Sequence, residues 1–301
     1  MLIIGNKYKF NNIEINNLKH KYQLIFVPYS KASHSQENIR QLQEYLRLSS
    51  HKTIIINIDN IDNQLSNYLQ QLTENGYRYI SIEDFLEKYL QKLYLSPTIL
   101  VNIKPFSKWQ YFQKRLVDFT ISIPLMILSC PVILYSIYRI KKESPEGSII
   151  FQQIRVGKDG KPFDCYKLRS MHSDTKFFNQ YTQDEDPRIF KWGTFMRKSR
   201  IDELPQLLNV IKGEMHLIGP RAEWIDLVKD YEKQLPNYHK RHKVAPGITG
   251  WAQVNYPYGR NLEDTRQKLM YDLYYIKNWN LWLEIKTIFK TIAVVLGKKG
   301  I

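Results

Sequence analysis

Two adjacent carboxylates, Asp202 and Glu203, lie within the arginine-rich segment MRKSRIDELPQLLNVIKGEMHLIGPR, residues 196–221. A carboxylate can attack phosphorus or carbon and form a covalent intermediate. Adjacent acids can also hold Mg²⁺ against phosphate oxygens, because Mg²⁺ prefers oxygen ligands. Arginines bind phosphates bidentately and neutralise charge in the transition state; here they are Arg197, Arg200 and Arg221. These residue types predict chemistry on a phosphate-bearing substrate.

The same segment also has a purely structural interpretation. Apolar residues recur with helical spacing from Leu204 to Ile211, and Gly213 follows as a stop signal. Ser199 or Asp202 could cap this helix, and acids at a helix N-terminus are stabilised by the helix dipole. Spacing alone therefore leaves the structural and the catalytic interpretations open.

An uncharged run, FTISIPLMILSCPVILYSIY at residues 119–138, precedes this segment. Its twenty residues are long enough to cross a bilayer. Basic residues flank both ends, however, and a single crossing cannot place both flanks on the cytoplasmic side. Pro131 removes an amide donor and favours a bend. We expect a re-entrant membrane helix over residues 115–140, broken at Pro131, in preference to a buried core helix or a spanning helix.

Residues 1–100 predict a small α/β domain, followed by a short linker from Ser96 to Pro105. Runs rich in β-branched and aromatic residues alternate with helical spacing: strands at 24–29, 53–58 and 79–82, helices at 38–48, 63–77 and 83–95. Such alternation is typical of a parallel sheet. No G-x-G-x-x-G pattern occurs there, so dinucleotide binding is not predicted and a regulatory or scaffolding role is expected.

The composition points to an anionic partner. The 301 residues carry a formal net charge of +15, which suits nucleic acid, anionic lipid or a phosphorylated substrate. No recognition-helix, zinc or RNA-binding pattern is found, so nucleic acid is not expected. The two cysteines, Cys130 and Cys165, build no disulfide framework, and the N-terminus shows no signal-peptide pattern. A cytoplasmic catalytic part is therefore expected.

Two segments near the C-terminus keep two interpretations each. The aromatic residues of the amphipathic stretch at 269–296 either pack as core or lie at a membrane surface; they are Tyr271, Tyr274, Tyr275, Trp279 and Trp282. In RHKVAPGITGWAQV, Arg241, His242 and Lys243 form either a solvated basic patch or a surface that faces headgroups or a nucleotide.

From about Lys114 to the C-terminus, the chain resembles the bacterial sugar transferases that prime glycan assembly, the monotopic polyprenyl-phosphate phosphoglycosyl transferases. The matching segments stand in family order after the apolar run: FQQIRVGKDGKPF, YKLRSM, DPRI, MRKSRIDELPQLLNVIKGEM, IGPR, RHKVAPGITGWAQVN and YDLYYIKNW. We therefore expect an α+β chain. A compact membrane-associated catalytic domain over residues 107–301, with a re-entrant helix-break-helix hairpin, would follow the small α/β domain.

The resemblance implies transfer of a phosphosugar from a UDP-sugar to polyprenyl (undecaprenyl) phosphate, with Mg²⁺, at the cytoplasmic face of the bacterial inner membrane. Asp202 would be the nucleophile that expels UMP, Glu203 would position the ion and the nucleophile, and both would be metal ligands. Arg221 would contact phosphate, and Arg197 is a second candidate for that role. Lys167 and Arg169 are further candidates for substrate binding, and Gln253 would lie near the site.

The chain departs from the family pattern at two positions. Cys130 stands where serine usually precedes the helix-breaking Pro131, so Ser129 could supply the hydroxyl, and Ala222 replaces a proline after Arg221. A basic, membrane-associated scaffolding or binding protein without catalysis is the rival interpretation, and homodimerisation through the N-terminal domain is left open. The donor sugar, the lipid length and the glycan pathway do not follow from these residues.

Overall fold

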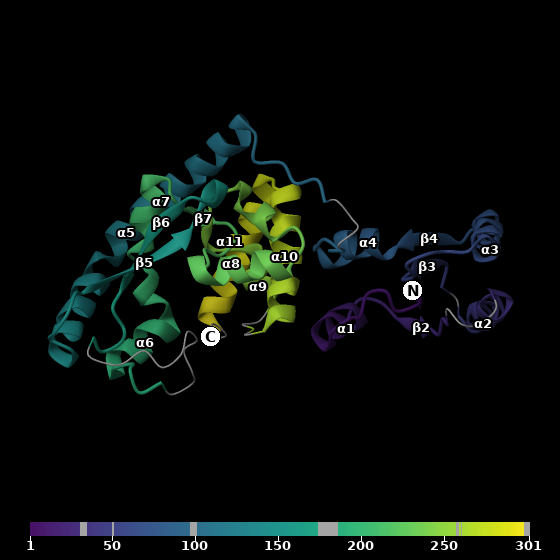
Figure 1. Ribbon diagram of the computed structural model, residues 1–301, viewed down its shortest axis with the longest axis horizontal. Helices are drawn as coiled ribbons and strands as arrows, with labels where there is room; N and C mark the ends of the chain where they lie inside the picture. Colours follow the sequence, from purple (N-terminus) through teal and green to yellow (C-terminus); the bar gives the residue numbers. More distant parts are fainter. Residues whose placement is uncertain are drawn as a thin grey trace. The chain divides into compact units, whose positions relative to one another are not determined.

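The chain divides into two compact units, Met1–Tyr94 and Leu95–Ile301. The computed structural model describes residues 1–30, 35–49, 51–96, 101–173, 186–256, 259 and 261–297 (Figure 1). Residues 97–100 of the expected linker lie outside this described part. Each unit has its own strands and helices.

The first unit contains a four-stranded parallel sheet in the order β2-β1-β3-β4. Its strands are β1 (Leu2–Ile4), β2 (Ile25–Val27), β3 (Thr53–Ile56) and β4 (Arg78–Ser81). Its helices are α1 (Asn12–Lys19), α2 (Ser35–Leu48), α3 (Asn63–Glu74) and α4 (Ile82–Phe85), followed by a π-helical turn at Leu86–Leu90. β2 and β3 fall within the predicted strand ranges, and β4 overlaps the predicted range 79–82 but begins one residue earlier. β1, which pairs with both β2 and β3, was not predicted.

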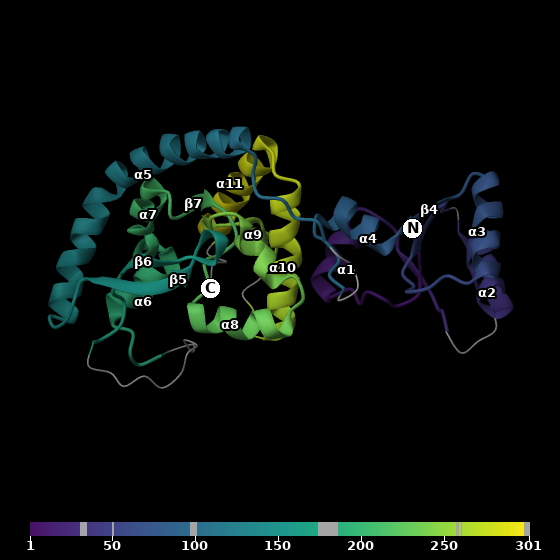
Figure 2. The same cartoon turned by 45° about the horizontal axis from the view of Figure 1, so that its top comes forward.

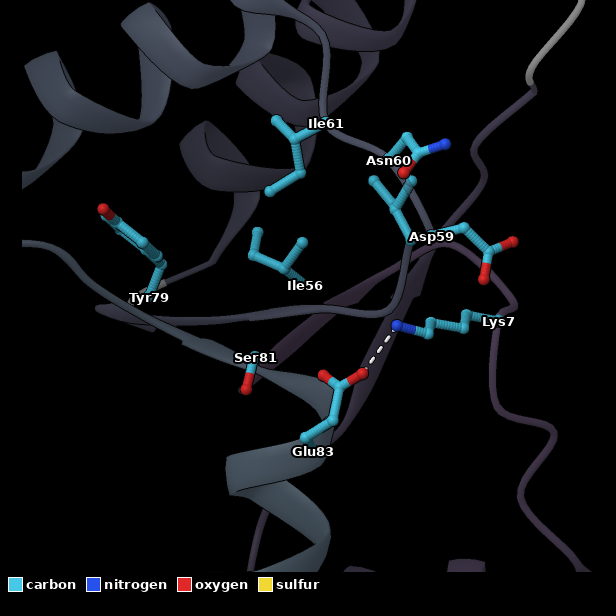
Figure 3. Close-up of a pocket in the computed structure, with 9 residues that line it drawn as sticks. Lys7, Ile56, Asp59, Asn60, Ile61, Tyr79, Ser81 and Glu83 are labelled. Atoms are coloured by element: carbon cyan, nitrogen blue, oxygen red, sulfur yellow. Dashed lines mark hydrogen bonds and ion pairs between the residues drawn. The ribbon is translucent and has the colours of Figure 1, made fainter. Parts of the chain in front are cut away.

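A cavity of about 380 Å³ lies beside the carboxyl ends of β3 and β4 (Figure 3). Ile56 and Tyr79 contribute apolar wall, and Asp59 follows β3. Lys7 also lines the cavity and forms an ion pair with Glu83 at 2.5 Å. The lining therefore combines apolar surface with both signs of charge.

The second unit begins with α5, a 36-residue helix from Lys108 to Glu143. Pro124 and Pro131 lie inside this helix, which continues through both of them. Instead of an interruption at Pro131, α5 shows a curve along its length (Figure 2). The Ser129 hydroxyl donates to the Met126 carbonyl at 3.0 Å, within the turn that precedes Pro131.

The two faces of α5 are reversed relative to a helix of a water-soluble protein. Its buried face carries small polar and charged side chains, at Lys114, Asp118, Ser122, Ser129 and Ser136, before Ile140. Its exposed face is apolar and includes Phe112, Leu116, Ile127, Leu128 and Leu134. The helix is long and apolar enough to enter a bilayer, and this pattern places the apolar face outward.

The remaining elements of the second unit mix helices with short sheets, as expected for an α+β fold. An antiparallel hairpin pairs β5 (Ile150–Val156) with β6 (Pro162–Leu168), and β7 (His216–Ile218) runs parallel to β8 (Gly247–Thr249). The helices are α6 (Lys191–Ser199), α7 (Gln206–Lys212), α8 (Ile225–Gln234), α9 (Trp251–Asn255), α10 (Leu262–Lys277) and α11 (Leu281–Leu296). Short 3₁₀ turns occur at Lys158–Gly160, Ile201–Glu203 and Tyr238–Lys243.

The C-terminal aromatic residues differ in their exposure. Tyr271, Tyr275 and Trp279 are buried as core, whereas Trp282 is 72% exposed. Trp282 belongs to an apolar stripe on α11 whose exposed members are Leu281, Trp282, Ile285, Phe289, Ile292 and Val295. α10 therefore packs inside the unit, and α11 presents apolar surface outward.

Candidate active site

Asp202 and Glu203 lie in the 3₁₀ turn Ile201–Glu203, between α6 and α7. The predicted helix cap is wrong: α7 begins at Gln206, after Pro205, and neither Ser199 nor Asp202 caps it. Arg200 adopts a left-handed conformation (φ 58°), which ends α6 and separates the acids from both helices. The Ser199 hydroxyl instead donates to the Phe195 carbonyl at 2.7 Å. Gly213 ends α7, as predicted.

Three cations surround the carboxylate of Glu203. Lys167 Nζ lies 2.8 Å from Oε1, Arg221 Nη2 lies 3.2 Å from Oε1, and Arg200 Nη1 lies 3.3 Å from Oε2. Burial by itself raises the pKa of Glu203, but these three charges outweigh burial and hold the pKa well below its usual value. Glu203 is therefore ionised at neutral pH.

Asp202 has the opposite electrostatic character. The side chain is buried, and within the described residues no hydrogen bond or ion pair occupies its carboxylate oxygens. Burial raises the pKa of Asp202 to about 6, and the Glu203 charge adds to this rise, against the opposing charges of Lys167 and Arg197. Neighbouring acids whose pKa values are pushed apart are a feature of sites that do chemistry.

The other predicted site residues separate into two groups. Lys167 and Arg221 contact Glu203 directly, and the charge of Arg197 acts on Asp202. Arg169 instead donates Nη1 to Ser144 Oγ and Nη2 to the Ser144 carbonyl, both at 2.7 Å, where α5 ends. Gln253 donates Nε2 to the Ile248 carbonyl at 3.4 Å. In the described part of the chain, neither Arg169 nor Gln253 contacts the acid pair.

Two residues that position the site were not predicted from the sequence. Asn209 of α7 accepts the Tyr166 N–H at 3.2 Å and donates to the Asp164 carbonyl at 2.7 Å, which holds α7 against β6. Arg241 donates to the Arg221 carbonyl at 2.9 Å. A polar residue within a helix of apolar spacing was the available signal for Asn209. Arg241 was noted only as part of a basic segment, and nothing local in the sequence indicated its contact with Arg221.

Burial distinguishes Arg241 from the rest of its basic segment. Its guanidinium is buried and binds Asp272 Oδ2 and the Tyr238 hydroxyl, each at 2.7 Å. Arg241 is therefore neither part of a solvated patch nor exposed to headgroups. It fixes the backbone that presents Arg221 to Glu203.

Close backbone packing supplies the second support for Arg221. Arg221 forms a parallel bridge with Gly247 of β8. A Cβ atom on Gly247 would lie 2.0 Å from the Gly219 nitrogen, so no larger residue fits without backbone movement. The glycines of this region therefore permit a close strand approach in addition to forming turns.

The chain is similar in sequence to known proteins. Residues 109–298 match the family described as bacterial sugar transferase. The UDP-N-acetylgalactosamine-undecaprenyl-phosphate N-acetylgalactosaminephosphotransferase of Aeromonas hydrophila is 40% identical over 234 residues, which are 77% of this chain and 52% of that protein. The UDP-glucose:undecaprenyl-phosphate glucose-1-phosphate transferase of Escherichia coli K12 is 34% identical over 265 residues, 85% of this chain and 57% of that protein.

A shorter relative is matched over most of its length. The uncharacterized sugar transferase EpsL of Bacillus subtilis is 42% identical over 191 residues, which are 62% of this chain and 89% of that protein. The chain spans about half the length of the two longer relatives. The family match covers the unit that contains the acid pair and its cations. The chain therefore belongs to the bacterial sugar transferase family.

Proposed function

We propose that the chain is a phosphoglycosyl transferase that moves a sugar phosphate from a UDP-sugar to undecaprenyl phosphate and so starts glycan assembly. The observation that carries this proposal is the unequal acid pair, in which three cations keep Glu203 ionised beside a buried Asp202 with a pKa of about 6. The Aeromonas hydrophila and Escherichia coli relatives are named for such transfers with different sugars, so the donor is left to experiment.

In the proposed first half-reaction, a carboxylate oxygen of Asp202 attacks the β-phosphorus of the UDP-sugar. The bond between this phosphorus and the bridging oxygen breaks, and UMP leaves with that oxygen. A pKa of about 6 suits a nucleophile, because the carboxylate is mostly ionised at neutral pH and more basic than an ordinary aspartate. The positive charges of Lys167 and Arg221 stabilise the charge that develops on the phosphate oxygens.

In the second half-reaction, a phosphate oxygen of the lipid attacks the phosphorus of the aspartyl phosphosugar. The bond to Asp202 breaks, the carboxylate is regenerated, and the lipid diphosphosugar is the product. Both attacking groups are anions and both leaving groups are stable as anions, so neither half-reaction requires a proton transfer. The proposed reaction therefore needs fixed positive charges more than it needs a proton donor, and the site is rich in such charges.

The donor set fits Mg²⁺. This ion binds proteins through one or two carboxylates and completes its shell with water and substrate phosphates. Within the described residues, no group of three or more His, Cys, Asp or Glu side chains forms a fuller metal cage. Asp202, whose carboxylate oxygens have no partner among the described residues, would hold the ion, which would supply neutralising charge to the diphosphate. Both oxygens of Glu203 face Lys167, Arg221 or Arg200, so Glu203 fits the ion less well than Asp202 does.

We further propose that α5 enters and leaves the membrane on its cytoplasmic side. The outward apolar face and inward serine face of α5 support insertion, because an exposed apolar surface of this size is unfavourable in water. The basic flanks at both ends favour a single side. The exposed stripe of α11 would lie at the same interface, with Trp282 at headgroup depth.

The expected result of a labelling experiment follows from this topology. Two variants are made in a chain whose Cys130 and Cys165 are replaced. One carries Lys104→Cys, before the apolar run, and the other carries Lys142→Cys, after it. In sealed inverted inner-membrane vesicles, a membrane-impermeant maleimide should label both positions to the extent seen after lysis. Labelling of only one position before lysis would establish a spanning helix and overturn the re-entrant proposal.

The proposed activity is tested by UMP release from a panel of UDP-sugars, with undecaprenyl phosphate, Mg²⁺ and the detergent-solubilised full chain. We expect release from one donor or a small set, dependent on the acceptor lipid for turnover beyond one equivalent, as a ping-pong scheme requires. No release from any donor, by protein shown to be folded, would favour the scaffolding interpretation.

A further inference from the structure

A second cavity, of about 210 Å³, lies in the second unit and is distinct from the acid pair. It is bordered by residues from four segments: the start of α5, the turn between β5 and β6, the first residue of β7, and the segment before β8. Its polar lining is basic, and its walls include aromatic rings: Phe106, Lys108, Tyr111, Lys158, His216 and Lys243. No carboxylate is among the lining residues that the structure describes.

The three lysines of this cavity have no carboxylate partner in the part of the chain that the structure describes. Within the described residues, none of Lys108, Lys158 and Lys243 forms an ion pair. Lys243 donates to the Ile103 carbonyl at 2.7 Å, and Lys158 Nζ lies 5.6 Å from the centre of the Tyr111 ring. Like charges around one cavity repel each other, and an anion in the cavity would relieve that repulsion.

His216 adds an oriented group at the cavity. The residue is 1% exposed, and its Nδ1 lies 2.6 Å from Asp118 Oδ2. Asp118 also accepts the Leu217 N–H at 2.8 Å, so its carboxylate acts as an acceptor and Nδ1 carries the proton.

The other ring nitrogen of His216, Nε2, is left for a ligand, since no described group is hydrogen-bonded to it. Burial, and after it the charge of Lys114, lower the pKa of His216 against the smaller raising effects of Asp118 and Glu284, so the imidazole is neutral at pH 7. With the proton on Nδ1, Nε2 is an acceptor that can bind a protonated phosphate oxygen or a hydroxyl group of an ester substituent. The positive charge of the cavity comes from the three lysines.

We propose that this cavity binds the phosphate group of a phosphate ester, at a site separate from Asp202 and Glu203. Lysine ammonium groups are compact charges that suit a phosphate approached from several directions. The apolar wall formed by Phe106, Val244 and Ala245 leaves room for an ester substituent, which free phosphate lacks.

An anionic phospholipid and a soluble phosphate ester share this chemistry. Lys108 and Tyr111 of the cavity lie in the first turn of α5 beside Trp109 and Phe112, whose stacked rings are both exposed. In the proposed membrane arrangement, this turn would lie at headgroup depth, which favours the lipid source. The two sources are therefore separate arms of the test.

The first arm uses the full chain in detergent and titrates it with glycerol 3-phosphate in a calorimeter. The variant is Lys158→Met, the second variant is Lys108→Met, and the matched control is Lys161→Met, an exposed lysine of the same β5–β6 connection that does not line the cavity. The second arm measures binding of the same proteins to phosphatidylcholine vesicles with and without phosphatidylglycerol.

We expect the affinity for glycerol 3-phosphate, for phosphatidylglycerol vesicles, or for both to fall about tenfold in the two cavity variants. Lys161→Met should keep the wild-type affinity in the same arm. Equal losses in Lys158→Met and Lys161→Met would mean only non-specific attraction and would overturn the site, as would wild-type binding to neither probe. UMP release should keep its wild-type rate in Lys158→Met, so failure here is distinguishable from failure of the proposed transferase activity.

Discussion

Asp202→Asn is expected to lower UMP release by at least about 10³-fold, with every UDP-sugar that the wild type uses, because the amide cannot form the phosphosugar adduct. Asparagine is close to aspartate in size and adds no charge, so the fold around it should persist. The measurement is the initial rate of UMP formation with saturating donor, together with a search for the covalent adduct by mass spectrometry of the wild-type chain. Release from Asp202→Asn at a rate near that of the wild type would refute the nucleophile assignment.

The same substitution is expected to stabilise the protein at neutral pH. The folded-state pKa of Asp202, about 6, lies above that of an unfolded aspartate, so folding is favoured at low pH and this contribution is lost as pH rises from about 4 to 6. Removing the buried charge should raise the free energy of unfolding by roughly 2–3 kcal/mol at pH 7.5. Thermal unfolding of the wild type and of Asp202→Asn should be measured at pH 4.5 and pH 7.5. The difference between their unfolding temperatures should be larger at pH 7.5.

Glu203→Gln is the matched control for this stability effect, because its sign is opposite. The pKa of Glu203 is held below its usual value by Lys167, Arg221 and Arg200, so its charge stabilises the folded state and is lost only at low pH. This variant should unfold at a lower temperature than the wild type at pH 7.5. If Asp202→Asn and Glu203→Gln shift the unfolding temperature in the same direction, the assigned charge states are wrong.

The residues that could be predicted are those whose signal is local in the sequence. Asp202 and Glu203 stand out as adjacent acids among arginines, and Gly213 stops α7 as its residue type indicates. The cap was mispredicted because the chain turns at Arg200 in a left-handed conformation, for which arginine gives no signal. β1 escaped prediction because its apolar run, MLII at residues 1–4, is shorter than the six-residue runs that predicted β2 and β3.

The residues that could not be predicted act over long distances in the sequence. Arg241 reaches Asp272 and the backbone of Arg221, and Asn209 reaches Asp164, and neither partner is implied by local spacing. The inward face of α5 is different, since Ser122, Ser129 and Ser136 recur every seven residues within the apolar run. That spacing is typical of a helix that packs along one polar stripe, and it was available from the sequence.

Lys167→Met is expected to displace the acid limb of the pH–rate profile to higher pH. Lys167 Nζ lies 2.8 Å from Glu203, and its charge lowers the pKa of Asp202 against the effect of burial. Without that charge, the pKa of Asp202 rises above about 6, and a smaller fraction of the nucleophile is ionised near neutral pH. The rate constant kcat/KM should therefore fall about tenfold or more at pH 6.5 and clearly less at pH 8.5.

Lys198→Met removes the same charge from an exposed position on α6 and should leave the acid limb unchanged. The comparison separates two roles of Lys167, because a lysine that only binds substrate phosphate would lower kcat/KM by the same factor at every pH. A uniform loss in Lys167→Met would thus assign it to phosphate binding alone and contradict its effect on Asp202. A displaced limb would instead show that Lys167, held against Glu203, sets the fraction of Asp202 that can attack the donor.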